Sequence, residues 1–342
     1  MQYMLLPAEG TFFKANLHSH STISDGKLTP EELKQLYKSN GYHVLAITDH
    51  EFLQIHPELN DDDFLTIGGY EMQLKKPATE DFPFPRVCHL NLYAKTPEAI
   101  PQVCYCPDRM PAKMKDLPVN YVGPQYPAEY CVEAVNHIIA EANRNGYLVC
   151  YNHPHWSMED LTIFSQYSGM FAMEIFNTDC NTIGIPEWNI QSWEWMLRRN
   201  KRIHCICADD NHNKRPLEDP LCDCFGGWVM IKAPALTYEN IIGALENGAF
   251  YSSTGPQIHS LYIEDGVLHI SCSEAQDIVM ATFGRKYGHL RAAPGQAVTQ
   301  DSFPIPKGSV YVRVEVKDHA GRYAESQAYW LDQIPSEALG EA

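Results

Sequence analysis

Short apolar runs, separated by stretches with a helical pattern, recur along the first three quarters of this chain. The runs cover residues 12–18, 43–48, 65–72, 87–94, 147–152, 171–177, 202–208 and 227–232. Several are apolar almost throughout, as in HVLAIT at residues 43–48, which is typical of strands buried on both faces of a parallel sheet. Helical patterns cover residues 29–41, 129–145, 188–200 and 238–246. This alternation of strand and helix predicts a (β/α) barrel.

The helix expected at residues 29–41 has signals at both ends. Thr29 is placed to cap it, Pro30 suits its first turn, and Glu32 completes a capping box. Gly41 terminates it. These signals place a helix between the first two expected strands.

From about residue 256 the pattern changes to alternation of apolar and polar residues. LYIEDGVLHIS at residues 261–271 is two alternating segments around an Asp-Gly turn, which indicates a β-hairpin. In SVYVRVEVKD at residues 309–318, every second residue from Val310 to Val316 is a valine. We therefore expect residues 256–342 to form a small antiparallel, sandwich-like β domain that follows a barrel domain at residues 1–255.

Two irregular segments interrupt the barrel pattern, at residues 73–86 and 95–128. Together they hold ten of the 23 prolines. The second segment is longer than an ordinary connection, and it follows a strand, so we expect it on the barrel face that carries the βα loops. We predict that it is a lid over that face; an ordinary surface excursion is the alternative.

The overall composition bounds the class of partner. The chain has 342 residues and a formal net charge of −17, which argues against a nucleic-acid polymer or a membrane as its partner. A small anionic substrate is compatible with this charge, because bound divalent cations can reverse the local field. The eleven cysteines are an odd number, and we expect ordinary reduced thiols. The N-terminus does not resemble a signal peptide, and no run approaches the roughly 20 apolar residues of a membrane helix, so a cytoplasmic protein is expected.

Most of the expected strands contain, or run into, an imidazole or a carboxylate. These residues are His18, His20, Asp49, His50, Glu71, His89, His153, Asp210 and His212. The carboxyl ends of barrel strands meet on one face, so these side chains are expected to converge there. Carboxylates that are packed together repel each other and are costly to bury unless cations compensate them. The sequence therefore predicts a metal site.

The types of donor narrow the choice of metal. Residues i and i+2 of an extended segment point the same way, so His18 and His20 can share one cation, and Asp210 and His212 project to one side. Imidazole and carboxylate together suit manganese, zinc or iron better than calcium or magnesium. The donors are too many for one tetrahedral ion. We expect two or three divalent transition metal ions, with a carboxylate that bridges two of them.

The motifs that carry these donors follow a recognisable order. HSH, SDG, TDH, GYE, CHLNLY, NHP and DDNH, in this order, resemble the PHP (polymerase and histidinol phosphatase) superfamily over residues 12 to about 254. NGAFYSSTGP at residues 247–256, followed by a segment that closes in RVEVKDHAGRYAESQAYWL, resembles the CehA/McbA-like branch, which includes carbamate hydrolases.

The resemblance implies a distorted (β/α)7 barrel with a trinuclear metal site. The implied ligands of the three ions are, in turn, His18, His20, Glu71 and Asp210; Glu71, His89 and His153; and Asp25, His50 and His212.

Other polar residues beside the expected strand ends are candidates for catalysis or substrate binding. The candidates for orienting a ligand or protonating the leaving group are Asp49 and His155. The candidate substrate-binding residues are Arg86, Asn177, Lys214 and Arg215. The three basic residues are included because a phosphoryl group in transfer needs cationic neighbours.

Together these features predict a metal-dependent phosphoesterase that cleaves a small phosphomonoester or nucleotide with a metal-bridging hydroxide. The first alternative is a carbamate, ester or amide hydrolase that uses the same metals, and the C-terminal resemblance motivates it. The second alternative is a non-catalytic metal-binding protein. A nuclease that acts on polymeric DNA is disfavoured by the acidic balance of the chain.

Overall fold

The chain forms two compact units in the structure of this protein, a computed structural model that describes residues 1–98, 100–126, 130–185, 188–285 and 287–340. The barrel unit comprises Phe13–Trp228 and Leu236–Ile242. The β unit comprises Met1–Phe12, Val229–Ala235 and Gly243–Ala342. The domain boundary that we expect near residue 255 stays a prediction.

Seven neighbouring strands of the described residues form the sheet of the barrel unit. In sheet order they are β2 (Thr11–Asn16), β3 (Val44–Ile47), β4 (Leu65–Lys76), β5 (Arg86–Ala94), β8 (Tyr147–Tyr151), β9 (Ala172–Asn177) and β10 (His204–Ala208). Backbone hydrogen bonds join the two ends of this row. Asp210 N donates to His18 O at 2.9 Å, and His20 N donates to Asn211 O at 3.0 Å. The row of strands therefore closes into a barrel.

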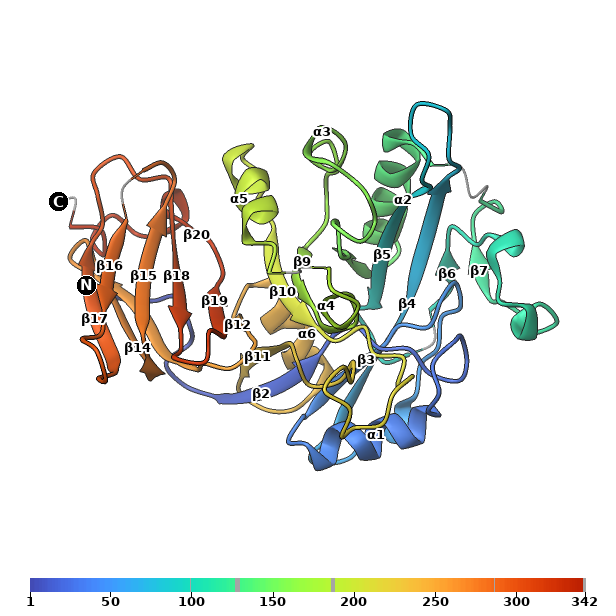
Figure 1. The fold of residues 1–342 in the computed structure, drawn as a ribbon, viewed down its shortest axis with the longest axis horizontal. Coiled ribbons are helices and arrows are strands. Elements are labelled where there is room, and N and C mark those ends of the chain that lie inside the picture. The colour runs from blue at the N-terminus through green and yellow to red at the C-terminus, as the bar shows by residue number, and fades with distance from the viewer. Residues whose placement is uncertain (99, 127–129, 186–187, 286, 341–342) are drawn as a thin grey trace. The chain divides into compact units, whose positions relative to one another are not determined.

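The barrel is distorted at β5, which runs antiparallel to both of its neighbours, β4 and β8. The pairs β2–β3, β3–β4, β8–β9 and β9–β10 are parallel. β4 and β5 continue as a long two-stranded ribbon that pairs Lys76 with Arg86 (Figure 1). The expectation that residues 73–86 are irregular is wrong for residues 73–76 and 86, which belong to β4 and β5. The antiparallel ladder continues to this pair because each further pair of residues satisfies the hydrogen bonds of its backbone groups. The predicted α/β class and the distorted barrel are confirmed.

The helices of the described residues are α1 (Pro30–Ser39), α2 (Val132–Arg144), α3 (Leu161–Phe164), α4 (Thr178–Thr182), α5 (Ile190–Arg198) and α6 (Tyr238–Glu246). α1 starts with the predicted capping box: Glu32 N donates to Thr29 Oγ1, and Thr29 N donates to Glu32 Oε2. The sequence pattern predicts α1, α2, α5 and α6, although residue 129, the expected start of α2, lies outside the described residues. It misses α3 and α4, because one turn is too short to show a helical period. In the part of the chain that the structure describes, no helix is long and apolar enough to cross a membrane.

The insert between β5 and α2 is ordered by its own small core. It holds the short paired strands β6 (Gln102–Val103) and β7 (Tyr121–Val122). Met110 and Met114 pack with Phe52, which follows β3, and with Ile23. Residues 99, 127 and 128 of the expected 95–128 segment lie outside the described residues. The described part of the insert thus contacts two loops at the barrel's carboxyl face.

The β unit consists of two sheets that share one core. The first contains β1 (Gln2–Met4), β13 (Ile258–Glu264), β14 (Val267–Ala275) and β17 (Val298–Pro304). The second contains β11 (Trp228–Ala233), β12 (Phe250–Ser253), β19 (Tyr323–Ser326), β18 (Tyr311–Lys317), β15 (Asp277–Thr282) and β16 (Gly288–Arg291), with β20 (Tyr329–Trp330) paired to β18. Leu261 and Ile270 of the first sheet pack in one cluster with Ile278 and Val314 of the second. The predicted antiparallel β domain is present, and it also includes the N-terminal strand β1, which pairs with β13.

Candidate metal centre

The barrel brings all nine predicted metal ligands together on one face. Within each of three groups, the possible ligand atoms lie within 4.8 Å of one another. The groups are His18, His20 and Asp210; Glu71, His89 and His153; and His20, Asp25, His50 and His212. We call them groups A, B and C in this order. The donors come from the chain that follows β2, β3, β8 and β10, including Asp25 in the loop between β2 and α1, and from the interiors of β4 and β5. They therefore meet only after the barrel has closed.

Group A has the geometry of a metal site. The Nε2 atoms of His18 and His20 lie 3.2 Å apart. Asp210 Oδ1 lies 3.1 Å from the first of these atoms and 3.0 Å from the second. Two nitrogens bound to one tetrahedral zinc ion are separated by about 3.3 Å, since each zinc–nitrogen bond is about 2.0–2.1 Å long. Asp210 Oδ1 is buried and makes no hydrogen bond of acceptable geometry. A cation shared by these three atoms fits the group.

Glu71 connects groups A and B. Its Oε1 atom lies 2.9 Å from His89 Nδ1 and 3.3 Å from His153 Nε2. The same atom lies 3.4 Å from His18 Nε2, and Oε2 lies 3.5 Å from His20 Nε2. The carboxylate is buried. Its position between the two imidazole pairs is that of a carboxylate able to bridge two cations.

Group C lies at the solvent side of the centre. Asp25 Oδ2 is 3.4 Å from His212 Nε2 and 3.8 Å from His50 Nε2. The Asp25 side chain is 50% exposed and that of His50 is 27% exposed. His20 also belongs to this group, because its ring lies 4.4 Å from the His50 ring and 4.3 Å from the His212 ring. The implied third ligand set does not include His20, which the structure places between groups A and C.

The charges of the centre compensate one another. Burial would raise the pKa of the Glu71 carboxyl, but neighbouring imidazoles hold it well below its usual range. Burial would lower the pKa values of His50 and His153, but neighbouring carboxylates raise each of them to about 9. Burial and two neighbouring imidazoles lower the pKa of His20 to about 4. The carboxylates are therefore ionised at neutral pH, the state in which they bind metal ions.

A buried carboxylate, Glu174, orients ligands of groups A and B. Its Oε1 atom lies 2.7 Å from His18 Nδ1, and its Oε2 atom accepts a hydrogen bond from His153 N at 2.9 Å. Asn177 Nδ2 donates to Glu174 Oε2 at 3.0 Å and to Asp210 Oδ2 at 3.1 Å. Carboxylates that contact the far nitrogen of a histidine fix its ring and make it a better donor. The sequence analysis assigns Glu174 no role; the available signal is a single acid inside the apolar strand AMEIFN.

Asp49 organises the loop that carries His20 and Asp25. Asp49 Oδ1 accepts from Ser21 N at 2.8 Å and from Ser24 N at 2.9 Å. Its Oδ2 atom accepts from Ser21 Oγ at 2.6 Å. The loop then turns at a glycine, where an added Cβ at position 26 would lie 2.1 Å from His20 O. Residue 26 must therefore be a glycine for steric reasons. Both Asp49 carboxylate oxygens accept hydrogen bonds from the loop.

Two further aspartates hold the segment after β10. Asp209 is buried and accepts hydrogen bonds from Tyr37 Oη at 2.8 Å and Thr178 Oγ1 at 2.7 Å. Asp223 Oδ2 accepts from His212 N at 2.7 Å. Both accept hydrogen bonds from backbone or from side chains of the barrel, and neither is among the predicted site residues. Their residue type and spacing in the sequence do not distinguish them from surface acids.

The remaining predicted site residues lie at different places around the barrel. Arg86, at the start of β5, stacks over the Phe82 ring at 4.6 Å. His155 is exposed in the turn after β8. Arg215 pairs with Asp219 at 3.3 Å. Lys214 is exposed, and its charge acts on the pKa values of His212 and Asp179.

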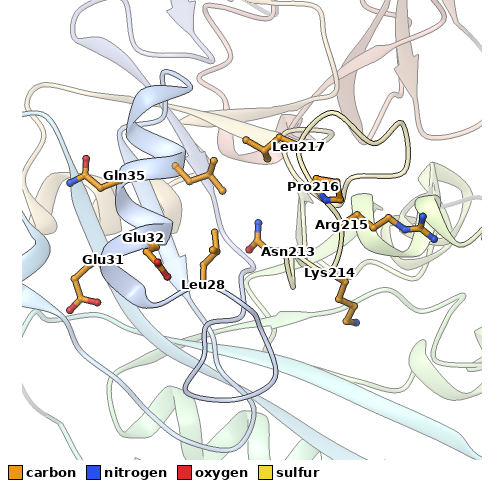
Figure 2. A pocket seen from close by; sticks show the side chains of 10 residues that line it. Leu28, Glu31, Glu32, Gln35, Asn213, Lys214, Arg215, Pro216 and Leu217 are labelled. Carbon is orange, nitrogen blue, oxygen red and sulfur yellow. The ribbon is translucent and has the colours of Figure 1, made fainter.

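A cavity of about 650 Å³ lies between α1 and residues 213–217 of the same unit (Figure 2). Its lining residues are Leu28, Glu31, Glu32, Gln35, Leu36, Asn213, Lys214, Arg215, Pro216 and Leu217. In the view of Figure 2 the Arg215 side chain extends away from α1. Lys214 and Arg215 both belong to the segment that lines the cavity opposite α1.

Known proteins resemble parts of this chain. The error-prone DNA polymerases of Mycobacterium bovis and Mycobacterium tuberculosis are 38% identical over 93 residues, which are 25% of this chain and 8% of each polymerase. The chain thus spans only a small part of these relatives.

Solved structures with a similar arrangement share little sequence with this chain. A two-domain protein from Bacteroides vulgatus, which contains a predicted PHP-like metal-dependent phosphoesterase, has a TM-score of 0.44 and 14% identity, with 92% of this chain and 94% of that chain covered. A protein from Bifidobacterium adolescentis that is predicted to be a metal-dependent phosphoesterase has a TM-score of 0.37 and 15% identity, with 63% and 91% covered. Values this low say nothing about what this chain acts on.

The PHP domain family model matches residues 16–182. The match runs from Asn16, the last residue of β2, to the end of α4 and includes seven of the nine predicted ligands. It ends before β10, which leads into Asp210 and His212. The order of the motifs, the closed barrel and the converging donors agree with this match. Residues 16–182 of this chain are therefore similar to a PHP domain.

Proposed function

We propose that this protein is a metal-dependent hydrolase and that its substrate is a small phosphomonoester or nucleotide. The observation that carries the proposal is Glu71, whose carboxylate contacts the imidazoles of two adjacent groups of donors. Two cation positions that share one carboxylate are typical of centres that hydrolyse phosphate esters. The similarity to a PHP domain and the buried Glu174, which orients donors of both groups, support it.

Group A would hold one ion, group B a second, and group C a third, with Glu71 shared between the first two. When bound, divalent ions supply an activated water and neutralise charge on the reacting group. The mixture of imidazole and carboxylate donors supports manganese, zinc or iron. Within the protein, Asp49 keeps the 18–26 loop in place, and Asn177 keeps Asp210 in place. We assign both a positioning role.

Lys214 is our candidate for the cation that contacts the phosphoryl group. It follows the group C ligand His212 by two residues and is exposed. Burial lowers the pKa of that imidazole and the carboxylates of Asp25 and Asp210 raise it above its usual value, and the Lys214 charge is close enough to oppose this rise. Arg86 and Arg215 are less suited, because each already contacts a partner side chain. His155, exposed two residues after His153, stays our candidate for the proton donor to the leaving group.

The second candidate function is a carbamate, ester or amide hydrolase with the same metal centre. It is favoured by the contacts of Arg86 and Arg215 with other side chains, and by the resemblance of residues 247–256 and 313–331 to the CehA/McbA-like branch. A neutral carbamate needs no cation for recognition, whereas a phosphate dianion does. We place a nucleic-acid polymer last as a substrate, because the net charge is −17.

A three-substrate assay separates these functions. The purified, manganese-loaded protein is tested on p-nitrophenyl phosphate, nucleoside monophosphates and a naphthyl carbamate, with the His18→Ala variant as the metal-site control. We expect the native protein alone to release phosphate. Turnover of the carbamate alone would reverse our ranking. Absence of turnover together with less than one equivalent of bound metal would rule out both hydrolase functions.

A further inference from the structure

Trp156 borders the metal centre on the side of group B. Its ring centroid lies 5.0 Å from that of His153, at an interplanar angle of 81°, and 5.3 Å from that of His89, at 54°. The two histidine side chains are 2% and 4% exposed, whereas Trp156 is 36% exposed. Part of the indole therefore covers the donors, and part of it faces solvent.

The turn that carries Trp156 is held at several points. Ser157 N donates to His153 O at 3.1 Å, and Val87 N donates to Ser157 O at 3.1 Å. Ser157 Oγ lies 3.2 Å from His153 Nδ1. Beyond the turn, the buried Glu159 accepts a hydrogen bond from Tyr151 Oη at 2.6 Å. An indole on such a turn loses little freedom when a ligand packs on it, which favours binding.

The exposed side of the centre defines where a substrate enters. Asp25 and His50 of group C are the solvent-exposed donors, and the donors of groups A and B are buried. A phosphoryl group that reaches Glu71 must project its leaving group out of the centre towards solvent. A leaving group that projects on the group B side would meet the indole of Trp156, which contacts His89 and His153 and is 36% exposed. Aromatic faces bind planar rings by offset stacking.

We propose that Trp156 is a specificity-determining residue that stacks against a planar aromatic or heterocyclic leaving group. The substrate class would then be aryl or nucleoside phosphomonoesters in preference to phosphates of aliphatic alcohols. This inference rests on the proposed function, because it takes the position of the phosphoryl group from it. It adds the chemical class of the group that leaves.

Kinetic comparison of Trp156→Ala and Trp156→Phe tests the proposal. The substrates are phenyl phosphate, adenosine monophosphate and glycerol phosphate, the last of which has no ring. We expect Trp156→Ala to raise KM roughly three- to tenfold for the two ring-bearing substrates and to leave kcat/KM for glycerol phosphate within about twofold. Trp156→Phe should restore most of the loss. The phenyl and adenosine arms distinguish a small aryl group from a nucleobase.

Met158 provides the matched control, because it lies in the same turn and its side chain is also exposed. Met158→Ala should keep KM within about twofold for all three substrates. Equal losses on ring-bearing and aliphatic substrates, or loss of bound metal in Trp156→Ala, would show that the indole only supports its histidine neighbours, and the proposal would be wrong.

A binding measurement keeps this inference separate from the proposed function. Calorimetry of the metal-loaded protein with a phosphonate analogue of adenosine monophosphate, in which a methylene group replaces the ester oxygen, reports stacking without turnover. Weaker binding to Trp156→Ala than to the native protein would support stacking on Trp156 even if no phosphate ester is hydrolysed. Equal binding to both proteins would show that Trp156 does not stack on the ligand, whatever the assay shows about hydrolysis.

Discussion

At the scale of single residues, Glu71 has the largest influence on the candidate site. It is buried among four imidazoles, His18, His50, His89 and His153, each with a nitrogen within 3.4 Å of one of its oxygens. Its negative charge holds these cationic or metal-bound rings together. Burial of this carboxylate is tolerable only because those neighbours compensate it.

Replacement of Glu71 by glutamine tests this role. Glutamine keeps the size of the side chain but removes the charge that two ions would share, so we expect the protein to lose at least one equivalent of metal. Turnover should fall by roughly a hundredfold or more. Even the loss of a residue that only hydrogen-bonds to a metal ligand lowers metal affinity or activity by roughly ten- to a hundredfold. Elemental analysis and kcat check this. Glu51→Gln, a change at another buried acid beside the centre, is the control and should retain its metal.

The histidine pKa values predict how the metal-free protein responds to pH. His50 and His153 have folded-state pKa values of about 9, above the usual 6.5. Their protonated forms therefore stabilise the fold fully below pH 6.5, and this stability is lost as the pH rises through about 9. The pKa of His20, lowered to about 4, acts in the opposite direction and costs stability only as the pH falls from 6.5 towards 4.

We therefore expect chemical denaturation of metal-free protein to give a lower free energy of unfolding at pH 9 than at pH 6.5. Bound metal keeps these rings unprotonated at both pH values, so the loaded protein should show a smaller difference. A larger drop in the loaded protein, or higher stability of the metal-free protein at pH 9, would contradict the assignment.

At the scale of elements, the insert between β5 and α2 is the segment placed to shape the opening. Its Gln102 side chain donates to Glu51 O at 2.9 Å and accepts from Leu53 N at 3.0 Å. Arg109 Nε lies 3.3 Å from Glu51 Oε1. The Lys113 ammonium donates to Thr22 O. These contacts tie the insert to the two loops that carry His50 and Asp25, which supports the lid that we predict.

Truncation of the insert's core should change substrate range more than global stability. In the double variant Met110→Ala and Met114→Ala, the insert loses its packing on Phe52, while the barrel core is untouched. We expect a changed ranking of KM values across a phosphoester panel and faster proteolysis within residues 100–126. The melting temperature should fall by only about 2–4 °C. Leu117→Ala, an exposed change in the same insert, should alter none of these.

At the scale of the whole molecule, metal binding and folding of the barrel unit are linked. The donors lie on strands and loops that run from His18 to His212, so an ion that binds them binds the folded barrel and not the unfolded chain. A ligand at a hundred times its Kd stabilises the folded state by about 2.7 kcal/mol.

We expect chelation to lower the melting temperature of the native protein and re-addition of manganese or zinc to restore it. Glu71→Gln should respond much less to the chelator, because its centre binds less metal. Differential scanning fluorimetry measures both. An unchanged melting temperature of the native protein, with metal shown to be removed by elemental analysis, would mean that the donors are stable without ions.

Several features of the fold and site are readable from the sequence because they depend on neighbours along the chain. Thr29, Pro30 and Glu32 lie within four residues of one another, so the start of α1 is a local property. The same holds for HSH, where i and i+2 side chains of extended chain point the same way. The expectation that Asp210 and His212 project to one side is wrong, because Asp210 has a positive φ of 54° and the two residues belong to groups A and C. Strands that are apolar throughout and end in His, Asp or Glu indicate the barrel and its active face.

Other features were decided only by the tertiary structure. Asp49 and Asp210 both follow a buried strand. Asp49 accepts hydrogen bonds from Ser21 and Ser24, whereas Asp210 Oδ1 accepts no hydrogen bond. The role of Glu174, the antiparallel direction of β5 and the pairing of β1 with β13 also depend on partners far away in the chain. Residue type and spacing determine what a side chain can donate or accept. Which of those capacities is still available is decided by the neighbours that the closed barrel brings to it.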